Sequence, residues 1–144
     1  MSPSAVVIMC ALDLLGGTVS TLPPIRVLDS PPTVVSPNAQ AFVDRSEGVI
    51  YMIASAPAFR EAVSAQYTPA LRGLCRPRAA LKIIASVIAH ELWHVEHGPD
   101  ERGAYQAQLG VLIRLGLGET WAFADVRRSM GVALNRQALR SQIR

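Results

Sequence analysis

The sequence predicts a small α+β domain in which a short β-hairpin or sheet layer packs on one central helix and two or three further helices. Three observations lead to this fold class. Two short apolar runs flank a polar turn within residues 41–53, which is the pattern of a hairpin. Helical periodicity then dominates from residue 78 to the end of the chain. The chain has 144 residues, of which 50% are hydrophobic and 17% charged. This composition suits one folded domain spanning residues 1–144 and excludes an intrinsically disordered chain.

The chain begins with an apolar run, Ala5–Leu15. Its length suits the core of a secretory signal, but no basic residue precedes it, Asp13 interrupts it, and no small-residue cleavage site follows. We therefore expect a buried strand or short helix, ended by Gly16 and Gly17, in a cytoplasmic rather than a secreted protein. No run reaches the 18 or so apolar residues of a membrane span, so we expect no transmembrane segment.

A proline-rich connector follows at residues 21–37, with one short strand expected at Ile25–Leu28. Cys10 and Cys75 are too few for a disulfide framework and match no metal-binding spacing. The hairpin comes next, formed by apolar runs at 41–43 and 49–53. Gly48 supplies the positive φ that its loop needs.

Helices are expected over most of the remaining chain. A short helix is predicted at Pro57–Tyr67, followed by a loop at 69–77. The strongest helical pattern, Arg78–His97, is stopped by Gly98 and Pro99. Asp100 can cap a helix that runs to about Leu115. A last helix covers about residues 119–144.

The last helix is basic. From Val126 onward it carries five arginines and no acid, in a chain whose net charge is +3. No aromatic or glycine-rich pattern accompanies these arginines, so we interpret them as a solvated helix face and do not expect nucleic acid as a partner.

The residues that can carry chemistry gather on the central helix. All three histidines lie within residues 90–97, and residues 90–94 read His-Glu-Leu-Trp-His. Histidines four apart on a helix share a face and can bind one metal ion, so His90 and His94 are candidate zinc ligands. Glu91 lies about 100° around the helix. It is therefore predicted to act beside the metal as the general base and acid that moves the proton of a metal-activated water.

A catalytic zinc needs a third protein ligand, and four residues are candidates. A chain reversal at residues 98–99 would bring Glu101 or Asp100 back toward the metal. Glu119 lies far enough along the chain for any geometry. His97 shares the histidine face but sits one turn further on, where it suits a supporting group or a helix cap.

The pair of segments HELWHVEHG (90–98) and DERGAYQAQ (100–108) resembles the zincin metallopeptidases, in particular small gluzincin-type enzymes of bacteria and their mobile elements. In these enzymes a glutamate on the following helix, often in the pattern Glu-x-x-Ala, completes the zinc site. Residues 101–104 match that pattern and make Glu101 the leading third ligand, although residues 119–122 match it too. The resemblance also implies that an edge strand holds the substrate, for which residues 48–53 stand in the right order.

Side chains near the proposed ligands can also contribute to the site or to the core. Tyr105 and Gln108 share a face with Glu101. The Tyr105 hydroxyl can stabilise the oxyanion if Glu101 binds metal, or its ring can pack between helices. Trp93, Trp121 and Phe123 are expected to pack in the core.

Together these features predict a zinc-dependent metallopeptidase with a peptide or protein substrate. Two alternatives remain open at this stage. One is a non-catalytic metal-binding or adaptor protein, and the other is a nucleic-acid-associated helical protein acting through the arginine-rich tail. The sequence carries no signal for an oligomeric state.

Overall fold

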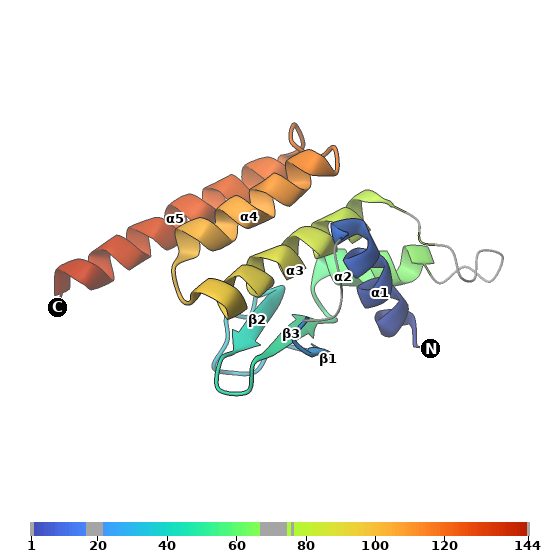
Figure 1. The fold of residues 1–144 in the computed structure, drawn as a ribbon, viewed down its shortest axis with the longest axis horizontal. Helices are drawn as coiled ribbons and strands as arrows, with labels where there is room; N and C mark the ends of the chain where they lie inside the picture. Colours follow the sequence, from blue (N-terminus) through green and yellow to red (C-terminus); the bar gives the residue numbers. More distant parts are fainter. Residues whose placement is uncertain (1, 17–21, 67–74, 76, 144) are drawn as a thin grey trace.

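The computed structural model describes residues 2–16, 22–66, 75 and 77–143 (Figure 1). These described residues form an α+β fold of five helices and one three-stranded mixed sheet, which confirms the predicted α+β class. The elements in chain order are α1 (Pro3–Leu15), β1 (Ile25–Leu28), β2 (Ala41–Asp44), β3 (Val49–Ile53), α2 (Pro57–Gln66), α3 (Ala79–His97), α4 (Glu101–Arg114) and α5 (Trp121–Ile143). The predicted loop at 69–77 lies mostly outside the described residues.

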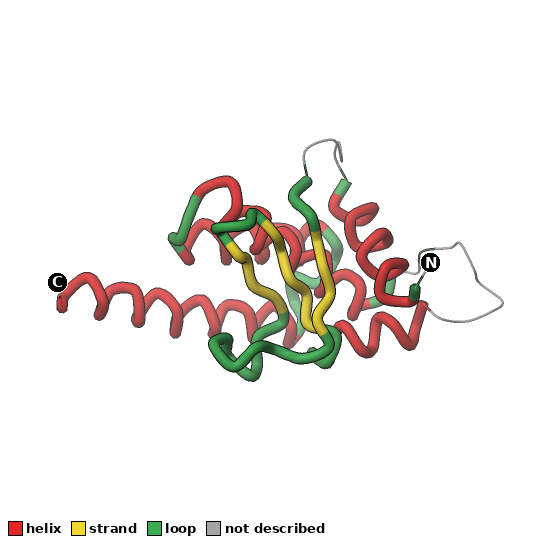
Figure 2. Tube along the Cα trace, turned by 90° about the horizontal axis from the view of Figure 1, so that it is seen from below, coloured by secondary structure: helices red, strands yellow, loops and turns green. Residues whose placement is uncertain are grey.

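The sheet has the strand order β1-β3-β2 (Figure 2). The predicted hairpin is confirmed, because β2 and β3 pair antiparallel across a turn in which Gly48 has φ 68°. The predicted strand at 25–28 is β1, which pairs with β3 in parallel. β3 is therefore the central strand. The expectation that residues 48–53 form the edge strand beside the site is wrong, because β1 occupies the second side of β3, and β2 is the edge strand on the other side.

Helix α3 is the centre of the molecule. The sheet packs on one side of it, α1 and α2 pack near its N-terminal end, and α4 packs on its opposite side, with α5 against α4 (Figure 1). Its buried side chains, including Ile84 and Ile88, join those of β3, α1 and α2 in one hydrophobic core. This burial explains why so much of the α3 sequence is apolar.

The N-terminal run forms a helix, the second of the two structures expected for it. Ser2 caps α1 by accepting a hydrogen bond from the Ala5 amide at 3.2 Å. The two cysteines, too few for a framework, form a single disulfide between Cys10 on α1 and Cys75, just before α3. Among the described residues, no helix is both long and apolar enough to cross a membrane.

Helices α4 and α5 pair through a second, smaller cluster built on Leu112, Leu117 and Val126. Phe123 packs against this cluster as expected. Trp121 does not: this first residue of α5 is 77% exposed. The C-terminal half of α5 extends past the α3–α4 turn (Figure 1).

Trp93 packs between helices rather than in the main core. Its ring stacks on His97, with centroids 4.7 Å apart, and lies directly over Gly103 of α4. A side chain at position 103 would overlap this ring, so glycine permits the close approach of α3 and α4 there.

Candidate metal centre

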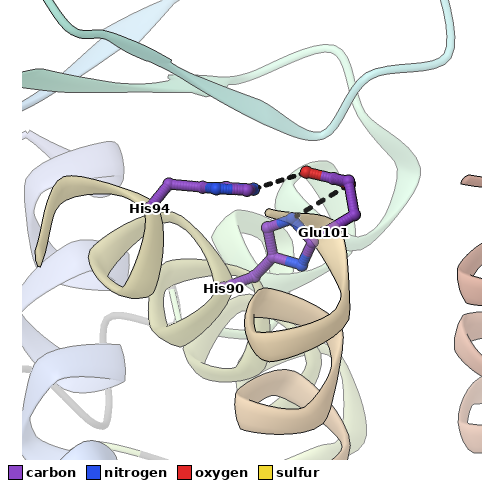
Figure 3. A group of neighbouring side chains, drawn as sticks. All are labelled: His90, His94 and Glu101. Carbon is purple, nitrogen blue, oxygen red and sulfur yellow. Dashed lines mark ion pairs between the residues drawn. The ribbon is translucent and has the colours of Figure 1, made fainter. Parts of the chain in front are cut away.

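Three side chains from two helices meet beside the sheet. His90 and His94 come from α3 and Glu101 from the first turn of α4, and they point toward one another (Figure 3). One donor atom from each lies within 4.8 Å of the others. The Glu101 carboxylate lies 2.6 Å from His94 Nε2 and 3.9 Å from His90 Nε2. Both histidines are buried, and Glu101 is partly exposed.

The turn between α3 and α4 produces this convergence. Gly98 ends α3 with φ 98°, a conformation that favours glycine, and its amide donates to the His94 carbonyl at 2.9 Å. Asp100 then caps α4 by accepting from the Arg102 amide at 3.4 Å. The chain reverses within a few residues, so the first residue of α4 faces back toward α3.

Each histidine is oriented by a hydrogen bond at its other ring nitrogen. His90 Nδ1 lies 2.9 Å from Oε1 of the buried Gln108, and His94 Nδ1 lies 2.8 Å from the Gly98 carbonyl oxygen. When Nδ1 carries the proton and donates it, the Nε2 lone pair is free to bind a metal. Both Nε2 atoms are the ones that face Glu101.

This donor set fits zinc. Two imidazoles and one carboxylate are a usual ligand set for a catalytic zinc, with bonds of about 2.0–2.2 Å and donors about 3.3 Å apart in a tetrahedral site. The observed separations of 2.6 and 3.9 Å involve different oxygens of Glu101 and lie on either side of that spacing. No fourth His, Cys, Asp or Glu joins the group among the described residues, which leaves one coordination position open.

Glu91 is buried and lines the same cavity as the three residues above. Burial raises the pKa of its carboxyl to about 7. Burial also lowers the pKa of His90. For His94, burial is the largest single effect and acts in the same direction, but the hydrogen bonds to Glu101 and to the Gly98 carbonyl, together with the charges of Glu101 and Glu91, raise its pKa overall. The hydrogen bond with His94 lowers the pKa of Glu101. Of the two carboxyls at this site, Glu91 is therefore protonated more easily than Glu101.

A cavity of about 430 Å³ opens over these residues. One wall is the edge strand β2 with the residues leading into it, and the opposite wall is the start of α5 at Asp125, Val126 and Ser129. β2 pairs only with β3 among the described strands, so its outer edge is available to another extended chain. Residues 41–44, and not the predicted residues 48–53, therefore form the edge strand beside the cavity.

Tyr105 forms part of the cavity floor. Its ring meets the His90 ring edge-on, with centroids 4.6 Å apart. Tyr105 therefore packs between α3 and α4, which is one of the two roles expected for it. Its hydroxyl makes no hydrogen bond among the described residues. Burial, followed by the nearby carboxylates of Glu101 and Glu91, raises the pKa of the phenol and keeps it protonated as a donor.

The other candidate ligands lie elsewhere. Glu119 is exposed and takes no part in the cluster. Asp100 is the helix cap. His97 is exposed at the end of α3, where its Nδ1 lies 3.2 Å from the Trp93 carbonyl oxygen, so it acts as a helix-end group as expected.

Two supporting residues were not assigned these roles from the sequence. The sequence pattern puts Gln108 on the same helix face as Glu101 but indicates no role for it. Its spacing of seven residues from Glu101 was the only available signal, because its burial is known only from the structure. Gln137 on α5 accepts from the Glu101 amide at 3.1 Å and donates to Asp100 Oδ1 at 3.0 Å. It lies 36 residues from Glu101, and no local pattern could have revealed this contact.

The chain matches no known family model, and no curated protein or solved structure is significantly similar to it. The function must therefore be argued from the site itself.

Proposed function

We propose that this protein is a zinc-dependent metallopeptidase whose zinc ligands are His90, His94 and Glu101. The observation that carries the proposal is the convergence of two oriented histidines and one carboxylate beside a buried glutamate, within a cavity bounded by an edge strand. Three protein donors with an open position support a catalytic site, whereas a purely structural zinc site is closed by four. The resemblance to zincins in residues 90–108 agrees with this proposal.

Peptide-bond hydrolysis needs a Lewis acid and a group that takes up a proton and later delivers it. A zinc ion held there supplies a Lewis acid that polarises the peptide carbonyl and lowers the pKa of water to about 7. Glu91 takes a proton from the attacking water as its oxygen bonds to the carbonyl carbon. It then gives that proton to the amide nitrogen as the C–N bond breaks, leaving a carboxylate and an amine. Burial raises the pKa of the Glu91 carboxyl, which makes it a better proton acceptor than a free carboxylate.

Tyr105 and β2 complete the proposed site. The Tyr105 hydroxyl lines the cavity and donates a hydrogen bond to the carbonyl oxygen as negative charge develops on it. An extended substrate pairs with the outer edge of β2, which fixes the scissile bond against the α3 face. Peptides or proteins with an accessible extended segment are therefore the proposed substrates.

The test is Glu91→Gln. We expect this variant to bind about one zinc per chain, as wild type does, and to lose peptide hydrolysis by a factor of about 10²–10⁴, the usual contribution of a general base. Zinc content is measured by elemental analysis, and hydrolysis with a pool of fluorogenic peptides. Glu96→Gln, on the exposed side of the same helix, is the matched control and should behave as wild type. Zinc-loaded Glu91→Gln that cleaves at the wild-type rate would contradict the assigned role.

A further inference from the structure

A second cavity adjoins the proposed catalytic site. It has a volume of about 650 Å³ and lies between the α3–α4 turn and the C-terminal half of α5. Glu101 and Tyr105 line both this cavity and the catalytic one, so the two hollows meet at these residues. A ligand group held in the second cavity would therefore lie next to the proposed catalytic site.

Two arginines of α5, Arg136 and Arg140, line the second cavity from one helix face. Their spacing of four residues places both guanidinium groups on the same side of α5. Neither forms an ion pair with any carboxylate of the described residues, although Asp100 and Glu101 line the same cavity.

The two carboxylates have other partners, and both arginines are exposed. Asp100 accepts hydrogen bonds from Gln137 and from the Arg102 amide. Glu101 turns its carboxylate toward His94 and His90. The cavity thus presents two cations whose donors remain available to a ligand.

We propose that this cavity, which we call the arginine cavity, binds a carboxylate of the peptide substrate and makes the enzyme selective for acidic segments. Planar guanidinium groups form paired, charge-assisted hydrogen bonds with carboxylates, which favours this ligand over a neutral side chain. The carboxylate can belong to an Asp or Glu side chain or to the substrate C-terminus. This inference rests on the proposed peptidase function and adds a substrate class to it.

A polyanion such as DNA is the competing ligand for an arginine-bearing helix. The observations favour a peptide because the two arginines line a cavity that shares Glu101 and Tyr105 with the proposed catalytic cavity, where a peptide would be held. The experiment includes DNA so that this alternative has a distinct result.

The experiment measures peptide binding to zinc-loaded Glu91→Gln protein by fluorescence anisotropy at fixed salt. Three fluorescein-labelled decapeptide pools serve as probes: an amidated pool containing Glu, the same amidated pool with Gln in place of Glu, and the Gln pool with a free C-terminal carboxylate. The variants are Arg136→Gln/Arg140→Gln and, as a control that removes the same charge outside this cavity, Arg60→Gln/Arg127→Gln.

We expect a carboxylate-bearing pool to bind about tenfold more tightly than the amidated Gln pool, because charge-assisted hydrogen bonds to a guanidinium group are stronger than those of a neutral amide. The preference should vanish in Arg136→Gln/Arg140→Gln and persist in the control. Tighter binding of the amidated Glu pool assigns the side chain as the source, and tighter binding of the free-acid pool assigns the C-terminus.

Three results would overturn the inference: no preference for a carboxylate, a preference that survives loss of both arginines, or duplex DNA that binds through the same arginines more tightly than the acidic pools. Failure of the proposed function looks different. Acid-selective binding that needs both arginines, in a protein that neither holds zinc nor cleaves these peptides as wild type, would leave the ligand class standing and refute the peptidase.

Discussion

Replacing Gly103 by alanine tests how closely α3 and α4 must approach to bring Glu101 to the two histidines. An added Cβ would overlap three ring carbons of Trp93, and even the farthest of them, Cη2, would be only 2.6 Å away. The Trp93 ring cannot simply swing aside, because His97 stacks on it. Either the ring leaves its rotamer or α4 moves away from α3.

The magnitude follows from a second glycine of the same helix. Gly110 also lies within α4, but a Cβ there meets no atom within 4 Å. Gly110→Ala should stabilise the protein by about 1 kcal/mol through helix propensity alone. Gly103→Ala has the same propensity gain and an overpacking cost of about 1–3 kcal/mol. The free energy of unfolding should therefore be about 1–3 kcal/mol lower for Gly103→Ala than for Gly110→Ala.

The zinc site should report the same displacement. Glu101 lies two residues before Gly103, so a shift of α4 moves a proposed ligand. We expect Gly103→Ala to weaken zinc binding by about 10–100-fold, the usual cost of disturbing a group that supports a ligand, and Gly110→Ala to leave it unchanged. Urea unfolding and zinc titration against a chromogenic chelator measure the two effects. Equal stability and equal zinc affinity in the two variants would refute the close approach of α3 and α4.

Three further predictions concern residues outside this contact. Gln137→Met removes both hydrogen bonds from α5 to the start of α4 and should weaken zinc binding about tenfold or more, whereas Ser141→Ala, one turn away, should not; equal affinities would contradict a positioning role. Reducing the Cys10–Cys75 disulfide, whose cysteines are 65 residues apart, should lower the free energy of unfolding by up to about 4 kcal/mol, as urea unfolding with and without reductant will show; no change would mean that the bond does not restrict the unfolded chain. Metal-free Glu91→Gln should be more stable than metal-free wild type at pH 8 but not at pH 4. Burial raises the pKa of Glu91 in the folded protein to about 7, so the protonated carboxyl stabilises wild type fully below the pKa that Glu91 has in the unfolded chain, and this stabilisation is lost as the pH rises through about 7. Thermal unfolding curves of the two proteins that differ equally at pH 4 and pH 8 would contradict this.

The proposed site was predictable where it depends on short spacings. A separation of four residues puts His90 and His94 on one helix face in any α-helix. Gly98 ends that helix and Asp100 caps the next, so residues adjacent in the sequence predict the chain reversal that brings Glu101 back toward the two histidines. Glu101 could be preferred over Glu119 for the same reason, because only Glu101 needs no distant element to place it.

The remaining features depend on contacts between distant segments. β1 pairs with β3 in parallel, and this pairing, which no local pattern specifies, makes β3 the central strand and leaves β2 as the sheet edge that lines the cavity. Gln137 reaches Asp100 across 37 residues. The disulfide joins α1 to a residue 65 positions later in the chain, and the exposure of Trp121 depends on how α5 packs. In each case the tertiary arrangement decides which of several locally equivalent structures forms.

Zinc titration of Glu101→Ala beside Glu119→Ala is the most direct test of the proposed metal centre. Both carboxylates begin a Glu-x-x-Ala segment, but only Glu101 lies with His90 and His94. We expect wild type and Glu119→Ala to bind one zinc per chain with equal affinity, and Glu101→Ala to lose more than the 10–100-fold that removal of a merely supporting group costs. Retention of wild-type zinc affinity by Glu101→Ala, with or without its loss in Glu119→Ala, would contradict the proposed centre.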